Sequence, residues 1–325
     1  MSGPVALSAA DLEKRLTFPA LVEALREGFG RGIIVPIRHH HSIQVPGEQE
    51  ATLLLMPAWD MAGAGGDGAG DGEHIGVKVV TVHPGNSARG LPSVQATYLL
   101  LDGRTGTLMA TLDGTMLTLR RTAAASALAA SYLAREDASR LLMVGAGALA
   151  PHLIAAHASQ RPITRVDIWN HRPERAEALA ATLRRGGARY DVRAVDDLEA
   201  AAREADIVSC ATLSAEPLIR GAWLKAGAHL DLVGAFTPAM REGDDAAVAR
   251  AAIFVDTRAG ALREAGDIMQ PIAAGLIGEA AIRADLFDLC RGLHPGRSDA
   301  DEVTLFKSVG TALEDLVAAA FSLRA

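Results

Sequence analysis

The sequence predicts an α/β protein in which a Rossmann-type, doubly wound parallel sheet is joined to a mainly antiparallel α+β domain. From residue 141 onward, short apolar stretches alternate with helical patterns, as strands and crossover helices do in a parallel sheet. The first stretch leads into Gly145-Ala146-Gly147-Ala148-Leu149-Ala150, a turn of the form Gly-x-Gly-x-x-Ala. Before residue 118, Gly, Pro and Asp turns separate strand-like stretches, which favours antiparallel pairing.

Two helices are expected at the start of the chain. Ser8 is suited to cap the first helix, and Asp11 supplies the acidic half of a pair that resembles a capping box. The second helix is expected over 18–28, and strands are expected at 42–45, 52–56, 76–82, 94–101 and 107–112. The Gly- and Asp-rich segment 61–74 has no apolar periodicity, so we expect a flexible hairpin loop without chemistry of its own.

A helix over 118–134 introduces the alternating region. Strands are expected at 141–144, 165–169, 191–195, 207–211, 229–233 and 253–255, with helices over 149–159, 173–184 and 198–204. The N-terminal sheet is poorly equipped to bury both faces, so we expect the last helix, 311–323, to return to it and a second subunit to pair with an edge or face. The predicted domains are 1–117 together with 307–325, and 118–306.

The glycine turn indicates a nucleotide cofactor. Gly145 permits a tight turn, and Gly147 lets the backbone approach a pyrophosphate. Ala146 and Ala148 belong to the same turn at the start of a helix, where backbone amides face the phosphates. A glycine turn without a ligand is the alternative, because Gly and Ala are abundant here. The strand at 165–169, which ends where a Rossmann unit places its ribose-reading residue, favours dinucleotide binding.

The residues after that strand favour NADPH over NADH, with NADH still possible. NAD enzymes generally carry Asp or Glu at this position, whereas this chain has Asn170, His171 and Arg172, with Arg175 further on. An amide and a guanidinium suit a 2′-phosphate through charge and bidentate geometry. The alternative is that Arg172 is an ordinary solvated side chain before a helix.

Composition excludes several classes of function. The 325 residues are 49% hydrophobic without a run that resembles a membrane span, and the N-terminal segment 1–20 has no sustained apolar core, so we expect a cytoplasmic protein that does not bind membranes. The net charge of −7 argues against a nucleic-acid partner. Cys210 and Cys290 are expected to be buried free thiols.

Five stretches, spread along the chain, form a pattern that is more specific together than apart. They are Arg38 after Pro36, Leu54-Leu55-Met56-Pro57, Gly76-Val77-Lys78 followed by His83-Pro84-Gly85-Asn86, Leu117-Thr118-Leu119-Arg120-Arg121-Thr122-Ala123-Ala124, and Thr304-Leu305-Phe306-Lys307-Ser308-Val309-Gly310. Together they resemble the ornithine cyclodeaminase/mu-crystallin family over essentially the whole chain. The Arg-Thr-Ala-Ala segment, followed in order by the glycine turn, is far more specific than either piece. The resemblance implies an NAD(P)-binding Rossmann domain, a substrate and dimerisation domain built from both chain ends, and a homodimer.

The same resemblance places Arg38, Lys78 and Arg121 around a substrate carboxylate, with Lys78 as the candidate catalytic residue. It adds Thr212 and Ser308 to the candidate cofactor-binding residues. Arginine suits bidentate recognition of a carboxylate, and a lysine inside an apolar strand needs an anionic partner. The alternative is that each cation forms a structural ion pair with one of three acids: Asp60, Asp102 or Asp113.

His39, His40 and His41 do not predict a metal site. Adjacent residues on a strand point to opposite faces, and no Asp, Glu or Cys lies at a convincing ligand spacing. One of the three could donate a proton to a substrate, although a surface histidine is the favoured interpretation.

Two departures from the family pattern favour reduction over cyclodeamination. Cyclodeaminases of the family resemble Glu-Leu-Met-Pro where this chain has Leu54, and they carry an Asp in the loop that here contains Phe236. Cyclodeamination needs several proton transfers, whereas a preformed cyclic ketimine needs only a carboxylate clamp, a hydride donor and one proton. We therefore expect reduction of Δ1-pyrroline-2-carboxylate and Δ1-piperideine-2-carboxylate to proline and pipecolate. The alternatives are an ornithine cyclodeaminase, an alanine or N-alkyl amino-acid dehydrogenase, and a non-catalytic NADPH-linked binder.

Overall fold

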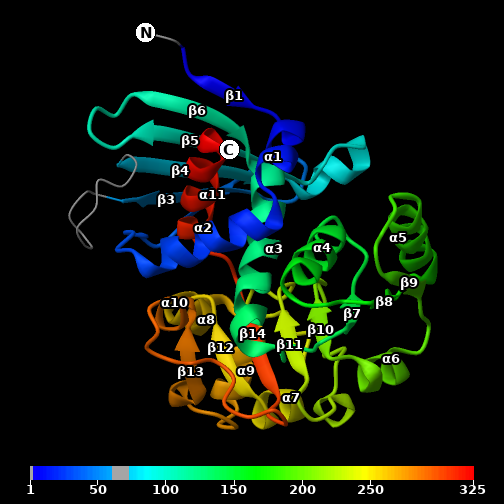
Figure 1. Cartoon of the computed structure of the whole chain (residues 1–325). Coiled ribbons are helices and arrows are strands. Elements are labelled where there is room, and N and C mark those ends of the chain that lie inside the picture. Colours follow the sequence, from blue (N-terminus) through cyan, green and yellow to red (C-terminus); the bar gives the residue numbers. More distant parts are fainter. Residues whose placement is uncertain (1–2, 61–72) are drawn as a thin grey trace. The chain divides into compact units, whose positions relative to one another are not determined.

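The computed structural model describes residues 3–60 and 73–325, so most of the expected hairpin loop at 61–74 lies outside the described residues. The chain divides into two compact units (Figure 1): unit 1 comprises residues 1–122 with 311–325, and unit 2 comprises residues 123–310. The first division falls inside helix α3 (Gly114–Leu133). The boundaries expected from sequence, after residues 117 and 306, lie a few residues before the two divisions.

Unit 1 contains a six-stranded sheet in the order β1-β6-β5-β4-β3-β2. Its strands are β1 (Val5–Leu7), β2 (His39–Ile43), β3 (Ala51–Trp59), β4 (His74–Val82), β5 (Val94–Asp102) and β6 (Leu108–Asp113). Neighbouring strands are antiparallel except β1, which lies parallel to β6. The mainly antiparallel sheet is therefore confirmed. Strand β2 begins earlier than expected because His39 pairs with Leu55, and an apolar pattern does not mark polar residues that extend a ladder.

Three helices of unit 1 flank this sheet: α1 (Ala9–Arg15), α2 (Phe18–Gly30) and α11 (Ala312–Arg324), in addition to the 3₁₀ helix η1 (Pro84–Arg89). The expected cap of α1 is confirmed, since Ser8 Oγ accepts from Asp11 N at 3.3 Å and Asp11 Oδ2 accepts from Ser8 N at 3.0 Å. Helix α11 packs against β3, β4, β5 and α2, so the last helix returns to the N-terminal sheet as predicted.

The two faces of this sheet differ in burial. Residues of β4 are alternately buried and half-exposed, because successive side chains point to opposite faces. Gly76 and Lys78 face α11: a Cβ on Gly76 would lie 2.9 Å from Leu316. Val77 and Val79 point to the opposite face and remain half-exposed. One face of the sheet is therefore covered by its own helices, and the other presents apolar side chains.

Unit 2 contains an eight-stranded, all-parallel sheet in the order β13-β12-β14-β11-β10-β7-β8-β9. Its strands are β7 (Arg140–Val144), β8 (Arg165–Trp169), β9 (Asp191–Ala194), β10 (Ile207–Cys210), β11 (His229–Leu232), β12 (Ala252–Val255), β13 (Ile282–Asp285) and β14 (Thr304–Lys307). The order runs from β7 through β8 to β9 in one direction and through β10 to β11 in the other, which confirms the doubly wound, Rossmann-type fold.

Helices connect these strands along the chain. They are α4 (Ala150–Gln160), α5 (Pro173–Arg185), α6 (Leu198–Glu204), η2 (Gly221–Trp223), α7 (Asp245–Arg250), α8 (Arg258–Glu264), α9 (Gly266–Ala273), η3 (Glu279–Ala281) and α10 (Leu286–Cys290). Strands β13 and β14 were not expected from sequence. Strand β13 contains Arg283 and Asp285, and β14 begins at Thr304 and ends at Lys307, so neither presents the continuous apolar run that marks a buried strand.

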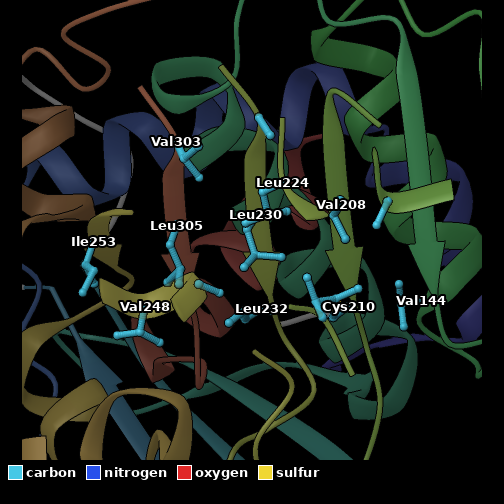
Figure 2. Close-up of a cluster of buried hydrophobic side chains, with 14 of the residues drawn as sticks. Val144, Val208, Cys210, Leu224, Leu230, Leu232, Val248, Ile253, Val303 and Leu305 are labelled. Atoms are coloured by element: carbon cyan, nitrogen blue, oxygen red, sulfur yellow. The ribbon is translucent and has the colours of Figure 1, made fainter. Parts of the chain in front are cut away.

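The core of unit 2 lies along its central strands. Figure 2 shows Val208, Leu230 and Leu305 side by side from β10, β11 and β14, and these residues are fully buried. Strands covered on both faces become almost continuously apolar, which is how the sequence signalled them. Cys210 lies in this cluster and Cys290 is half-buried; neither forms a disulfide. Within residues 3–60 and 73–325, no helix is long and apolar enough to cross a membrane.

Candidate functional site

The glycine turn follows β7 at the carboxyl edge of the parallel sheet. Gly145 has φ of +108°, and a Cβ there would lie 2.6 Å from the Ala211 carbonyl oxygen, so both conformation and contact require glycine. At Gly147, by contrast, an added Cβ would meet nothing within 4 Å. Gly147 and Ala148 are exposed just before helix α4 begins at Ala150. The turn is therefore closed on the sheet side and open on the side where a phosphate would approach.

The candidate ribose-reading residues follow β8. Asn170 Oδ1 accepts a hydrogen bond from Ala146 N at 3.2 Å, and Asn170 Nδ2 donates to the Arg172 carbonyl oxygen at 3.1 Å. Asn170 thus joins the glycine turn to the segment before α5. His171 and Arg172 are exposed. Asn170 positions the backbone of this edge, and Arg172 carries the accessible positive charge.

Thr212 and Ser308 follow β10 and β14 at the same edge of the sheet. Thr212 N and Oγ1 donate to Glu242 Oε1 at 2.7 and 2.8 Å. Ser308 is buried, and its N–H donates to the Leu232 carbonyl oxygen at 3.2 Å. Sequence reasoning missed Glu242, which lies within the charged run Arg241-Glu242-Gly243-Asp244-Asp245, a composition typical of a solvated loop.

In unit 1, Lys78 is a buried ammonium on β4. Its Nζ lies 2.8 Å from Asp315 Oδ2, donates to Asp315 Oδ1 at 3.0 Å and donates to Thr118 Oγ1 at 3.3 Å. The pKa of Lys78 is lowered to about 8, chiefly by burial and also by the charges of Arg121 and Arg38, against the opposing effect of Asp315. Lys78 is therefore a cation that can lose its proton not far above neutral pH.

Arg121 lies on α3 beside the same carboxylate. Its Nε is 3.0 Å from Asp315 Oδ1, and its Nη1 forms an ion pair with Glu314 Oε2. The side chains of Arg121, Glu314 and Asp315 are all buried. Half-buried Arg38 also acts on this cluster, because its charge lowers the pKa of Lys78. Two carboxylates of α11 thus hold Lys78 and Arg121 as buried cations, and a carboxylate is the kind of group that such cations bind.

The carboxylates that pair with Lys78 and Arg121 differ from those considered in the sequence. Asp60 Oδ1 accepts from His74 N at 2.7 Å, Asp102 Oδ1 accepts from Thr105 N at 2.8 Å, and Asp113 Oδ1 accepts from Met116 N at 2.7 Å. Each of these three carboxylates thus accepts a hydrogen bond from a backbone N–H group. The observed partners, Glu314 and Asp315, lie in the first turn of α11, where acidic residues are ordinary because they favour the helix dipole.

The two positions that lack the cyclodeaminase acids carry apolar side chains. Leu54 is half-buried on β3, opposite Val80 on one neighbouring strand and His40 on the other. Phe236 is 47% exposed in the loop that follows β11. His39, His40 and His41 lie on β2 with exposed side chains. Among the described residues, no group of three or more His, Cys, Asp and Glu is placed to hold a metal ion.

Comparison with known proteins gives consistent matches over nearly the whole chain. The model of the ornithine cyclodeaminase/mu-crystallin family matches residues 4–322. The Δ1-pyrroline-2-carboxylate reductase of Paracoccus denitrificans is 42% identical over 324 residues, which cover 99% of this chain and 97% of the relative. The ketimine reductase mu-crystallin of Mus musculus is 33% identical over 324 residues, covering 97% and 95%.

The fold also matches that of a relative of known structure over nearly the whole chain. The Δ1-pyrroline-2-carboxylate reductase of Thermococcus litoralis, solved in complex with NADH and L-proline, matches with a TM-score of 0.87 at 33% sequence identity, covering 98% of this chain and 96% of that one. The chain therefore belongs to the ornithine cyclodeaminase/mu-crystallin family.

Proposed function

We propose that this protein is an NAD(P)H-dependent reductase of cyclic ketimine carboxylates, converting Δ1-pyrroline-2-carboxylate and Δ1-piperideine-2-carboxylate to L-proline and L-pipecolate. The observation that carries the proposal is the buried ion-pair cluster of unit 1, in which Asp315 and Glu314 hold the cations Lys78 and Arg121, and the charge of Arg38 acts on Lys78. Reductases of such imines among the relatives support the same conclusion.

Within this proposal, the three cations bind and orient the substrate carboxylate. Arg121 and Arg38 offer guanidinium N–H groups, which suit a carboxylate, and the ion pairs with Glu314 and Asp315 fix the Arg121 side chain in place. Lys78 is protonated at neutral pH, since its pKa is about 8, and we assign it the transfer of a proton to the imine nitrogen. Solvent can restore that proton.

The cofactor supplies the hydride when it is bound, and unit 2 carries the residues that would hold it. Gly145, Ala146, Gly147 and Ala148 form the turn for the pyrophosphate, with Thr212 and Ser308 further along the same sheet edge. We propose that the NADPH form is preferred, because Asn170 stands where NAD enzymes carry an acid and Arg172 is exposed two residues later. The Thermococcus litoralis relative was solved with NADH, so the preference rests on this chain's own residues.

We further propose a homodimer formed through unit 1. The sheet face opposite α11 is apolar and half-exposed on several strands, including Val77 and Val79 on β4, Leu55 on β3 and Leu99 on β5. A contiguous apolar face of this kind is typical of a subunit interface. Unit 1 would thus bind substrate and dimerise, while unit 2 binds cofactor. The two free thiols fit a reducing, cytoplasmic location.

The experiment that tests the function is oxidation of NADPH and NADH by the purified protein against a panel of substrates. We expect turnover with the two cyclic imine carboxylates and a lower KM for NADPH than for NADH. Pyruvate with ammonia or methylamine tests the amino-acid dehydrogenase alternative, and light scattering tests the dimer. Turnover confined to pyruvate with an amine, or no turnover with any substrate, would overturn the proposal.

A further inference from the structure

A buried carboxylate joins two loops at the cofactor edge of unit 2. Glu242 is fully buried in the segment between β11 and α7. Its Oε1 accepts from Thr212 N at 2.7 Å and from Thr212 Oγ1 at 2.8 Å, while its Oε2 accepts from Gly234 N at 2.8 Å and Ala235 N at 3.3 Å. One side chain therefore binds the turn after β10 and the turn after β11.

These two turns also touch each other and the glycine turn. A Cβ on Gly234 would lie 2.0 Å from the Thr212 carbonyl oxygen, and a Cβ on Gly145 would lie 3.2 Å from Thr212 Cγ2. The backbones at Gly234 and Thr212 are thus in contact at a distance that only glycine permits. Thr212 lies between the turns that follow β7 and β11, and Glu242 determines where it lies.

Glu242 is itself held by a second buried acid. Asp267, in the first turn of α9, accepts from Glu242 N at 2.8 Å and Gly243 N at 3.0 Å through Oδ1. Lys307 Nζ, at the end of β14, lies 3.3 Å from Asp267 Oδ2, and all three charged side chains are fully buried. Burial raises the pKa of Glu242, and the charge of Lys307 opposes that shift.

Such an arrangement costs desolvation energy that an apolar cluster would not. Buried ion pairs contribute little net stability compared with well-packed hydrophobic side chains, so their presence is better explained by the geometry that they impose. Here the ion-pair cluster fixes the positions of Thr212 and of the Gly234–Ala235 turn. All four hydrogen bonds described above for the Glu242 carboxylate are donated by these two segments.

In a doubly wound sheet, a dinucleotide lies across the carboxyl ends of the strands where their order reverses, which here is between β7 and β10. With the pyrophosphate at the turn after β7 and the ribose-reading residues after β8, a bound cofactor would place its nicotinamide half toward the turns after β10 and β11. We propose that Glu242 is the positioning residue for the nicotinamide half of the cofactor, acting through Thr212 and the Gly234–Ala235 turn. This inference rests on the proposed nicotinamide cofactor, although it does not require a particular imine substrate.

The informative substitution is Glu242→Gln, which keeps the shape of the side chain and removes its charge. Glutamine has one acceptor oxygen, and its NH₂ group would face N–H or O–H donors from one of the two turns. The matched control is Asp206→Asn at the opposite edge of the same sheet. Asp206 is also buried and accepts from Ser139 N and Arg140 N, both at 2.9 Å, beside the amino ends of β7 and β10.

Binding is measured by calorimetry with two probes, NADPH and 2′-phospho-ADP, which lacks the nicotinamide and the ribose attached to it. We expect Glu242→Gln to weaken NADPH about tenfold and to leave the nicotinamide-free probe within about twofold of the parent, because charge-assisted hydrogen bonds are lost at one half of the site only. Asp206→Asn is expected to leave the affinity for both probes unchanged. If Glu242→Gln does not fold, Glu242→Asp, which shortens the side chain, is tested with the same two probes. The same selective loss of NADPH affinity is expected.

Equal weakening of both probes by the Glu242 variant, or no weakening of NADPH, would overturn the inference and leave Glu242 as a purely structural residue. Failure of the proposed function gives a different result. A parent protein that binds NADPH but reduces no imine would contradict the substrate assignment, and the two-probe comparison would still decide the role of Glu242.

Discussion

Lys78 Nζ lies 2.8 Å from Asp315 Oδ2, in an ion pair whose two side chains are almost completely buried. This pair links the central strand β4 to the last helix α11, and Asp315 also holds Arg121 at 3.0 Å. A single carboxylate thus fixes two of the three cations that we assign to substrate binding. Asp315 therefore both positions Lys78 and Arg121 for substrate binding and attaches the C-terminal helix α11 to the sheet.

The titration of Lys78 predicts an alkaline loss of substrate binding. Because its pKa is lowered to about 8, chiefly by burial, the protonated and charged form is present below about pH 8 and is lost above it. We expect kcat/KM for a cyclic imine carboxylate to fall above about pH 8, by about tenfold per pH unit. The bound carboxylate stabilises the ammonium, so the fall in kcat should occur at higher pH.

The Lys78→Arg variant separates this titration from that of the substrate. A guanidinium stays charged throughout the range, so its profile keeps only the pH dependence that belongs to the imine itself. We expect the variant to be less active at neutral pH and to lack the additional alkaline fall. The same alkaline fall in the parent and in the variant would show that Lys78 is not responsible.

Substitution of Asp315 by Asn tests its structural contribution. The change removes the carboxylate that pairs with buried Lys78 and leaves Arg121 its ion pair with Glu314, so we expect a loss of about 3–5 kcal/mol in the free energy of unfolding. The control is Glu199→Gln, which breaks an exposed pair with Arg203 and should cost less than about 1 kcal/mol. Chemical denaturation measures both, and similar losses in the two variants would contradict the prediction.

Removal of Arg121 tests the clamp itself. We expect Arg121→Ala to lower kcat/KM for the imine carboxylates by about 100-fold or more, with part of the loss in kcat, because the carboxylate orients the imine carbon for hydride transfer. The Kd for NADPH should change little, since Arg121 belongs to unit 1. The matched substrate is 1-pyrroline, which lacks the carboxylate: the parent should reduce it poorly. Equal reduction of 1-pyrroline and its 2-carboxylate by the parent would refute the clamp.

Arg172 determines the cofactor preference in our proposal. Arg172 is exposed after β8, and one charge-assisted contact to a 2′-phosphate is worth about 1.5–3 kcal/mol. We therefore expect Arg172→Ala to raise KM for NADPH by about 10- to 100-fold and to leave KM for NADH nearly unchanged. Arg184→Ala is the control, because Arg184 lies on helix α5, which begins directly after Arg172, but is paired with Glu177. Equal use of the two cofactors by the parent would contradict this assignment.

The parts of the molecule that follow from local sequence were predicted well. The glycine turn, the capping pair of α1 and the main strands each depend on residues close together in the chain, and the structure agrees with them. Lys78 was expected to need an anionic partner, and it has one. The identity of that partner was not predictable from spacing, because Lys78 and Asp315 are 237 residues apart in sequence.

Two further features escaped sequence reasoning for related reasons. Strand β14 is only four residues long and inserts between β11 and β12, a position that is set by sheet topology and not by its own composition. Glu242 belongs to a charged run that resembles a surface loop, yet its carboxylate is buried because Thr212, Gly234 and Ala235 supply donors from other segments. Tertiary hydrogen bonding overrides local composition in this case.

The last prediction concerns reaction type and follows from the apolar residues at two positions. Leu54 is half-buried on β3 and Phe236 is partly exposed after β11, and neither side chain can accept a proton. Cyclodeamination of ornithine requires its ammonium groups to be deprotonated before hydride loss and ring closure, whereas a cyclic ketimine arrives already closed. We therefore expect negligible ammonia release from L-ornithine with NAD.

The purified protein is given L-ornithine with NAD while ammonia is followed, and the same preparation is given Δ1-pyrroline-2-carboxylate with NADPH. Imine reduction should proceed in the second assay, which also serves as the control that the protein is active. The clamp can still hold the carboxylate of ornithine, so ornithine is expected to inhibit imine reduction competitively without being consumed. Robust ammonia production together with weak imine reduction would restore the cyclodeaminase assignment, because it would mean that other groups supply the missing bases.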